Sequence, residues 1–93
     1  MDKRDDLTEL PNIGKKIAEK LRKIGVKDKN DFLKRDPYVV FEKLRKELDP
    51  GMCRCALASI VGAKQGRVWH EITKESAEEF DKRYPKHNWR NKC

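Results

Sequence analysis

The chain has 93 residues, of which 42% are charged and 37% hydrophobic, and its net charge is +7. That length suits one domain with a single small core, and no stretch approaches the roughly 20 apolar residues of a membrane helix. The N-terminus also lacks the apolar run of a signal peptide, so we expect a cytoplasmic protein with no membrane partner. The positive charge favours an anionic partner, although a basic balance also serves simply to keep a small protein soluble.

The first predicted element is a helix-hairpin-helix over residues 7–26, with Leu10-Pro11-Asn12-Ile13-Gly14 as its turn. Asparagine tolerates the left-handed backbone of a tight turn, and glycine adopts it freely. After the turn, apolar residues recur at helical spacing, and Gly25 is expected to end the helix. These residues are Ile17, Ala18, Leu21 and Ile24.

Two acidic caps predict the next two helices. Asp28 suits the N-cap of a short helix through Phe32 and Leu33, and Asp36-Pro37 opens a longer one because proline is favoured at the first helical position. Asp49-Pro50 repeats this pattern and predicts the start of a third helix. That helix is the least charged part of the chain, so we expect it to form the centre of the core and to end at Gly66.

The C-terminal third is predicted to hold a short covering segment around Trp69, followed by a helix from Thr73 to about Arg83. Residues 86–93 are expected to form a flexible tail, with Trp89 docked back onto the core. No alternating strand pattern occurs anywhere in the chain. The sequence therefore predicts an all-α protein, a compact bundle of about five helices forming one domain over residues 1–85.

The hairpin carries the strongest signal for function. The first amides of the helix after Gly14 have no partner within the helix, and the helix dipole adds positive charge there. Lys15 and Lys16 bring two full charges to the same place, which makes it a candidate anion site. Between Gly14 and Lys29, seven basic residues stand against two acidic ones, a local excess of +5. We predict a nucleic-acid site formed by Asn12, Gly14, Lys15, Lys16, Lys20 and Lys23.

Such a site would hold the DNA phosphate backbone without strong sequence preference, with micromolar or weaker affinity at physiological salt. Two alternatives stay open. The hairpin also reads as a purely structural corner with Ile13 plugging the core. The protein also reads as an interaction module or homodimer whose surface is formed by exposed Phe80, Tyr84 and Trp89.

Several segments in order resemble the C-terminal domain of TfoX, a bacterial regulator of competence for DNA uptake. They are residues 10–21, Ile24-Gly25-Val26, Asp31-Phe32, Asp36-Pro37 and residues 62–72, of which the last, ending in Trp69-His70-Glu71-Ile72, is the most diagnostic. The position of the first glycine in the family hairpin is Asn12 here. The resemblance implies a five-helix fold similar to SAM domains, a bacterial origin and a link to competence or its regulation.

Other residues give weaker signals. Trp69 and His70 are considered as a platform for stacking bases, but packing of Trp69 on the core helix is the favoured interpretation, with His70 on the surface. Cys53 and Cys55 lie too close together to bridge easily, and buried inert thiols are favoured over redox-active ones. Neither metal-ligand spacing nor a nucleophile with a basic partner occurs. We therefore expect a binding module with no metal or cofactor, not an enzyme.

Overall fold

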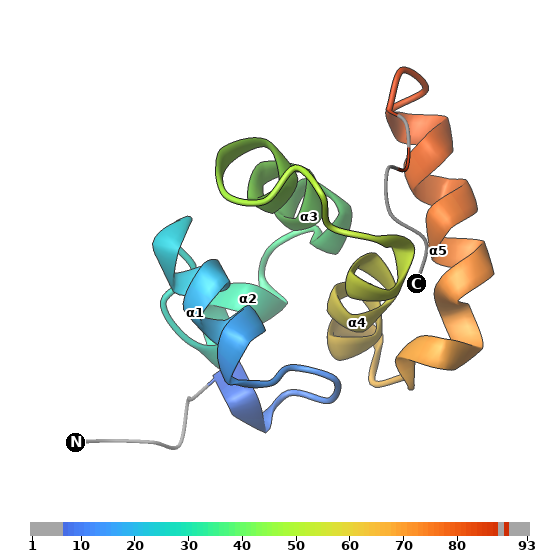
Figure 1. Cartoon of the computed structure of the whole chain (residues 1–93). Coiled ribbons are helices and arrows are strands. Elements are labelled where there is room, and N and C mark those ends of the chain that lie inside the picture. Colours follow the sequence, from blue (N-terminus) through green and yellow to red (C-terminus); the bar gives the residue numbers. More distant parts are fainter. Residues whose placement is uncertain (1–6, 88, 90–93) are drawn as a thin grey trace.

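The computed structural model describes residues 7–87 and 89, and within these residues every regular element is a helix. A short 3-10 helix precedes five α-helices, which confirms the predicted all-α bundle (Figure 1). None of the described helices is both long and apolar enough to cross a membrane. The elements are η1 (Leu7–Glu9), α1 (Lys15–Lys23), α2 (Lys29–Leu33), α3 (Pro37–Glu47), α4 (Arg54–Gln65) and α5 (Trp69–Arg83).

Local sequence signals explain most of the helix boundaries. The Asp28 carboxylate accepts a hydrogen bond from the amide of Asp31 at 2.8 Å, and the Asp36 carboxylate accepts one from the amide of Tyr38 at 2.9 Å. Both side chains thereby satisfy amides that the helix itself leaves unpaired. Gly66 ends α4 with a left-handed backbone, φ +71°, which a glycine adopts without steric cost. These three predicted boundaries are confirmed.

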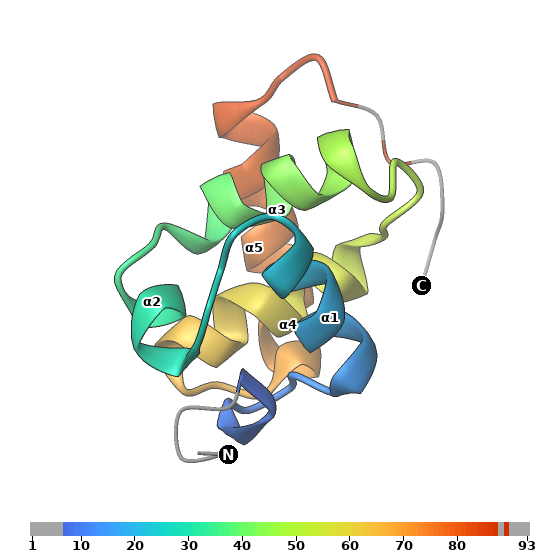
Figure 2. The same ribbon diagram turned by 90° about the vertical axis from the view of Figure 1, so that its left-hand side faces the viewer.

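Helix α4 lies in the middle of the molecule. Figures 1 and 2 show α5 along one side of it and the pair α1 and α2 on the other, with α3 crossing above. Its side chains Leu57, Ile60 and Val61 are at most 1% exposed. Phe41 of α3 and Phe80 of α5 meet edge to face with their ring centroids 5.2 Å apart, which joins the two outer helices over the core.

Two predicted helix starts are wrong. Helix α4 begins at Arg54 rather than after Pro50, because the Asp49 carboxylate accepts a hydrogen bond from the amide of Gly51 at 3.1 Å and closes a turn. Helix α5 begins at Trp69 rather than Thr73. The Thr73 hydroxyl donates to the carbonyl of Trp69 at 3.0 Å, so this threonine bonds one turn back inside the helix instead of capping it.

The described part of the C-terminus folds back onto the bundle. The Trp89 ring lies 5.8 Å from Phe41 and 5.5 Å from Phe80 between centroids, and its Nε1 donates to the Asp81 carboxylate at 3.0 Å. The docking predicted for Trp89 is therefore confirmed. Of the flexible tail predicted for residues 86–93, positions 88 and 90–93 lie outside the described residues.

Candidate nucleic-acid interface

The hairpin consists of η1, a turn over residues 10–14 and α1. Leu10 and Ile13 are 6% and 5% exposed, so two of the five turn residues anchor it in the core while Pro11 and Gly14 stay at the surface. The left-handed residue of the turn is Asn12, at φ 68°, whereas Gly14 has an extended backbone at φ −95° and precedes the first turn of α1. The sharp turn therefore depends on Asn12 and not, as expected, on Gly14.

Asn12 connects the hairpin to a distant part of the chain. Its Nδ2 donates to the Arg67 carbonyl at 2.8 Å, and its Oδ1 accepts from the Trp69 amide at 3.4 Å. We call these two contacts the Asn12 bridge. Because both ends of the amide are used by the connection between α4 and α5, the Asn12 side chain does not face outward for a phosphate. The structure gives Asn12 the role of positioning the turn, and its predicted nucleic-acid contact stays a prediction.

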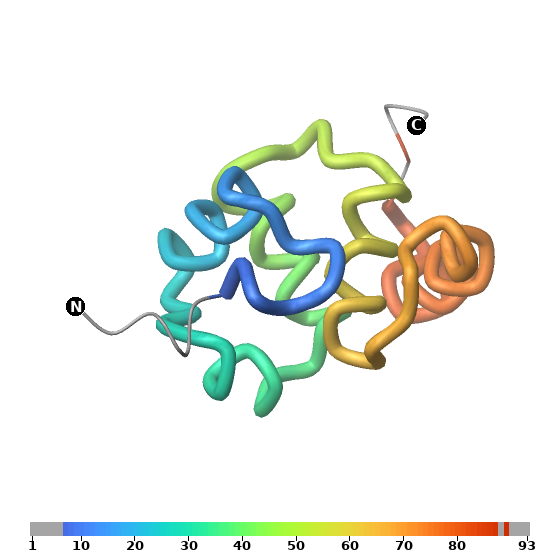
Figure 3. The backbone as a smooth tube through the Cα atoms, turned by 90° about the horizontal axis from the view of Figure 1, so that it is seen from below, coloured from blue at the N-terminus to red at the C-terminus, as the bar shows by residue number. Residues whose placement is uncertain are grey.

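The bridge depends on a glycine in α4. A Cβ atom at Gly62 would lie 2.4 Å from the Arg67 carbonyl oxygen and 2.6 Å from Asn12 Nδ2. Both distances are far below van der Waals contact, and Arg67 also donates its own amide to the Gly62 carbonyl at 2.9 Å. The absence of a side chain at Gly62 thus lets three segments meet: the hairpin turn, α4 and the loop before α5 (Figure 3).

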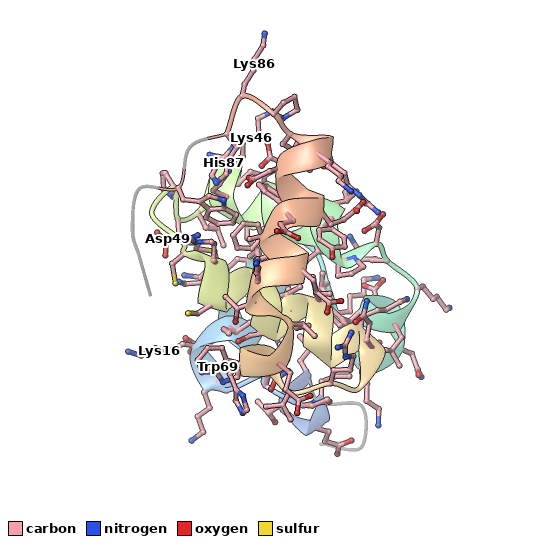
Figure 4. The ribbon with its side chains drawn as sticks, turned by 90° about the vertical axis from the view of Figure 1, so that its right-hand side faces the viewer. Lys16, Lys46, Asp49, Trp69, Lys86 and His87 are labelled. Carbon is pink, nitrogen blue, oxygen red and sulfur yellow. The ribbon has the colours of Figure 1, made fainter. Side chains whose placement is uncertain are left out.

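The start of α1 is open to solvent. Gly14 provides no side-chain cap, the first turn holds no acidic residue, and a Cβ at Gly14 would meet nothing within 4 Å. Lys15 and Lys16 are exposed, and neither has an ion-pair partner within residues 7–87 or at 89. Lys16 projects away from the body of the protein (Figure 4). Lys23, in the last turn of α1, is also exposed and also has no ion-pair partner among the described residues.

Lys20 differs from the other three lysines. Its Nζ lies 2.9 Å from the Asp49 Oδ2, with both side chains about half-buried. This hydrogen bond lowers the pKa of Asp49, so the carboxylate stays charged. The ion pair connects α1, through Lys20, to the turn that precedes α4. One of the three N–H donors of Lys20 is thereby used within the fold, and the carboxylate neutralises its charge locally. Of the six predicted residues, Gly14, Lys15, Lys16 and Lys23 are exposed and make no ion pair or side-chain hydrogen bond within residues 7–87 or at 89, whereas Asn12 and Lys20 have partners within the fold.

The predicted protein interface on α5 also needs correction. Phe80 is fully buried rather than exposed, because the buried positions of α5 at 72, 76, 77 and 80 turn it toward α3 and α4. Tyr84 packs on Phe80 with ring centroids 4.7 Å apart, and Tyr84 and Trp89 are both partly buried against the core. These three aromatic residues form an internal cluster, so they do not supply the exposed apolar patch that the sequence suggested.

Trp69, in contrast, is more exposed than the sequence predicted. Trp69 is 38% exposed and lies outside the buried core, so the favoured prediction that it packs on the core helix is wrong. As the first residue of α5, it has no preceding helical turn to cover it. His70 is exposed, as predicted. Sequence reasoning missed that α5 starts without a cap from its own segment: Val68 provides none, and the Trp69 amide donates to distant Asn12 instead.

Other chemistry finds little support in the described residues. No group of three or more His, Cys, Asp or Glu side chains among them converges on a point where a metal ion would bind. Cys53 and Cys55 are both half-buried, but both are disulfide-bonded, so the prediction of reduced, inert thiols is wrong. Among the described residues, Lys15 and Lys16 at the start of α1 combine unpaired charge with a helix start that has no side-chain cap.

Similarity to known proteins covers most of the chain. Residues 1–78 match a family model described as Cdd1, pathogenicity locus. The structure is similar to a crystal structure of an uncharacterized protein from Listeria monocytogenes, with a TM-score of 0.73 and 28% identity over 89% of this chain and 98% of that chain. No curated protein matches. Neither description mentions an activity, a ligand or TfoX, so the resemblance to TfoX stays a prediction.

Proposed function

The chain belongs to the Cdd1 family, whose description names a pathogenicity locus and no activity, and from its surface we propose that it binds DNA through the phosphate backbone. The contact is made by the amides after Gly14 together with Lys15 and Lys16, and it carries no strong sequence preference. A link to competence, which only the resemblance to TfoX implies, is not needed for this proposal.

The observation that carries the proposal is the unpaired cationic first turn of α1. Helices α2 and α3 begin with an aspartate that accepts a hydrogen bond from their first amides, whereas α1 begins with Gly14 and two lysines. An acidic cap would repel a phosphate, so its absence at α1 favours an external anion. The open space beside Gly14 leaves room for an oxygen atom to reach the amides.

Lys23 extends the same surface. It lies seven residues after Lys16, which corresponds to two helical turns and about 10 Å along the axis, on the same side of α1. A few lysine contacts support weak binding that depends steeply on salt, since each phosphate neutralised releases condensed counterions. The charge pattern supports a sequence-tolerant backbone contact better than base readout, for which the helix would need side chains suited to base edges.

The test compares two charge reversals of equal size. Lys15→Glu/Lys16→Glu changes the start of α1, and Lys43→Glu/Lys46→Glu makes the same change in net charge on two exposed lysines of α3. Figure 4 shows Lys46 at the opposite end of the molecule from Lys16. Duplex binding is titrated at several salt concentrations. We expect the α1 variant to lose binding and the α3 variant to retain most of it.

The salt dependence gives a second readout. Losing two phosphate contacts should reduce the slope of log affinity against log salt by about 2 for a duplex. Equal losses in the two variants would show that only total charge matters and would overturn the assignment of the site. Absence of duplex binding by the unmodified protein at low salt would overturn the proposed function itself.

A further inference from the structure

Two apolar side chains at the start of α5 are exposed to solvent. Val68 and Trp69 are 44% and 38% exposed, and neither belongs to the core. A tryptophan is seldom left open in this way, because its large apolar surface is costly to hydrate. The only ring against Trp69 among the described residues is that of His70, edge to face with centroids 5.6 Å apart. More than a third of the Trp69 surface is thus open to a ligand.

Trp69 lies beside the candidate DNA site. The Asn12 bridge holds the Trp69 amide 3.4 Å from a side chain of the hairpin turn, two residues before Gly14. Figure 4 shows Lys16 and Trp69 at the same end of the molecule, and Figure 3 shows the hairpin turn next to the start of α5. A DNA strand bound at the start of α1 would therefore pass close to the Trp69 side chain.

One lysine lies near Trp69 on the same helix. A groove of about 680 Å³ runs along α5 from Trp69, and His70 and Lys74 line it near that end, whereas Arg54 lines it from the start of α4, beside its far end (Figure 1). Its acidic residues Glu78 and Asp81 lie nine and twelve residues further on, about 14 and 18 Å along the helix axis. Glu71 is two residues from Trp69, about 200° around the helix, and points away from it. An aromatic side chain with Lys74 on the same helix and Lys16 at the same end of the molecule matches the chemistry of a nucleotide, a flat base carrying a phosphate.

We propose that Trp69 stacks on an unpaired base, so that the protein binds single-stranded DNA more tightly than duplex DNA. The inference rests on the proposed function, since the α1 lysines hold the phosphate backbone while Trp69 adds the stacking contact. Bases inside a duplex are already stacked on both faces and offer nothing to an indole at the surface. Stacking tolerates any sequence, because every base has a π-face.

Fluorescence tests this contact directly. The chain has two tryptophans, so Trp89→Phe leaves Trp69 as the sole indole and keeps a ring on Phe80. This protein is titrated with a short oligothymidine and with a duplex of the same length. We expect the oligothymidine to quench the Trp69 fluorescence and the duplex to leave it nearly unchanged. No quenching at oligothymidine concentrations that saturate binding would overturn the proposal.

Affinity measurements with Trp69→Ala supply the second arm. Loss of one stacked base is expected to weaken oligothymidine binding about 5- to 100-fold and duplex binding less than about 2-fold, with Trp69→Phe in between. Equal effects on both ligands would overturn the proposal but leave the phosphate contact intact. If neither ligand binds the unmodified protein, the proposed function fails and this inference with it.

A protein contact at Trp69 is the competing outcome. Sedimentation of the unmodified protein and Trp69→Ala at several concentrations detects it. Self-association that depends on Trp69, together with unchanged oligothymidine affinity in the variant, would show that the indole binds a second copy and would overturn the nucleic-acid assignment.

Discussion

At Gly62 the fold leaves no room for a side chain, and Gly62→Ala measures how much this close contact contributes to stability. In an ordinary helix interior, replacing glycine by alanine stabilises a protein by about 1 kcal/mol. Here the added Cβ would lie 2.4 Å from the Arg67 carbonyl oxygen, a backbone atom that cannot rotate away. The loop between α4 and α5 must therefore shift.

The size of the effect follows from two opposing contributions. Forcing a methyl group into a filled space costs about 1–3 kcal/mol. The shift also weakens the hydrogen bond from Asn12 Nδ2 to Arg67, worth about 0.5–1.5 kcal/mol. After subtracting the gain in helix propensity, we expect Gly62→Ala to lower the free energy of unfolding by about 2 kcal/mol. For a domain of this size, that corresponds to a loss of roughly 8–16 °C in Tm.

Urea unfolding followed by circular dichroism measures the change, with Gln65→Ala at an exposed position of α4 as the control. A double-mutant cycle with Asn12→Gly sharpens the test, because removing the Asn12 side chain relieves the 2.6 Å contact and should reduce the penalty of Gly62→Ala. A Gly62→Ala protein as stable as the unmodified one, or more stable, would refute the close approach of these segments.

Two further predictions concern the caps and charges of the helices. Hydrogen bonds from the Arg35 side chain and the Lys27 amide lower the pKa of Asp31, so its contribution to stability is present at neutral pH and is lost on acidification, as the pH falls through the lowered pKa. Asp31→Asn should therefore be less stable than the unmodified protein in urea at pH 7 and lose less stability on acidification, whereas identical pH profiles would contradict this. Gly14→Ser should raise stability by a few tenths of a kcal/mol by capping α1, since a Cβ there meets nothing within 4 Å. The same variant should weaken duplex binding because its hydroxyl competes for the amides, and unchanged affinity would speak against their role.

The helices could be predicted because their signals are local. An aspartate before a helix or a glycine after one acts within a few residues, so Asp28, Asp36 and Gly66 mark boundaries in the sequence itself. Asp49 looked the same but forms a turn, because its carboxylate is shared between Gly51 and Lys20. Lys20 is 29 residues away, so the competing partner could not be known from the pattern around Asp49.

The candidate site depended on contacts of still longer range. Whether Asn12 faces a phosphate or the fold was decided by Arg67 and Trp69, which are 55 and 57 residues away. In the same way, Phe80 appeared available in the sequence because the residues that cover it, among them Phe41 and Trp89, come from other parts of the chain. The two lysines of the first turn of α1 were easier to predict, since both are exposed and neither has an ion-pair partner in the described part of the chain.

The Asn12 bridge also bears on the order in which the protein folds and unfolds. It joins residues 55 positions apart, so the chain between them must be nearly in place before the two hydrogen bonds can form. Contacts of this kind are absent from an early transition state, and their loss accelerates unfolding while leaving the folding rate nearly unchanged. We therefore expect the Asn12 bridge to slow the unfolding of the protein. Its loss should raise the unfolding rate and change the folding rate little.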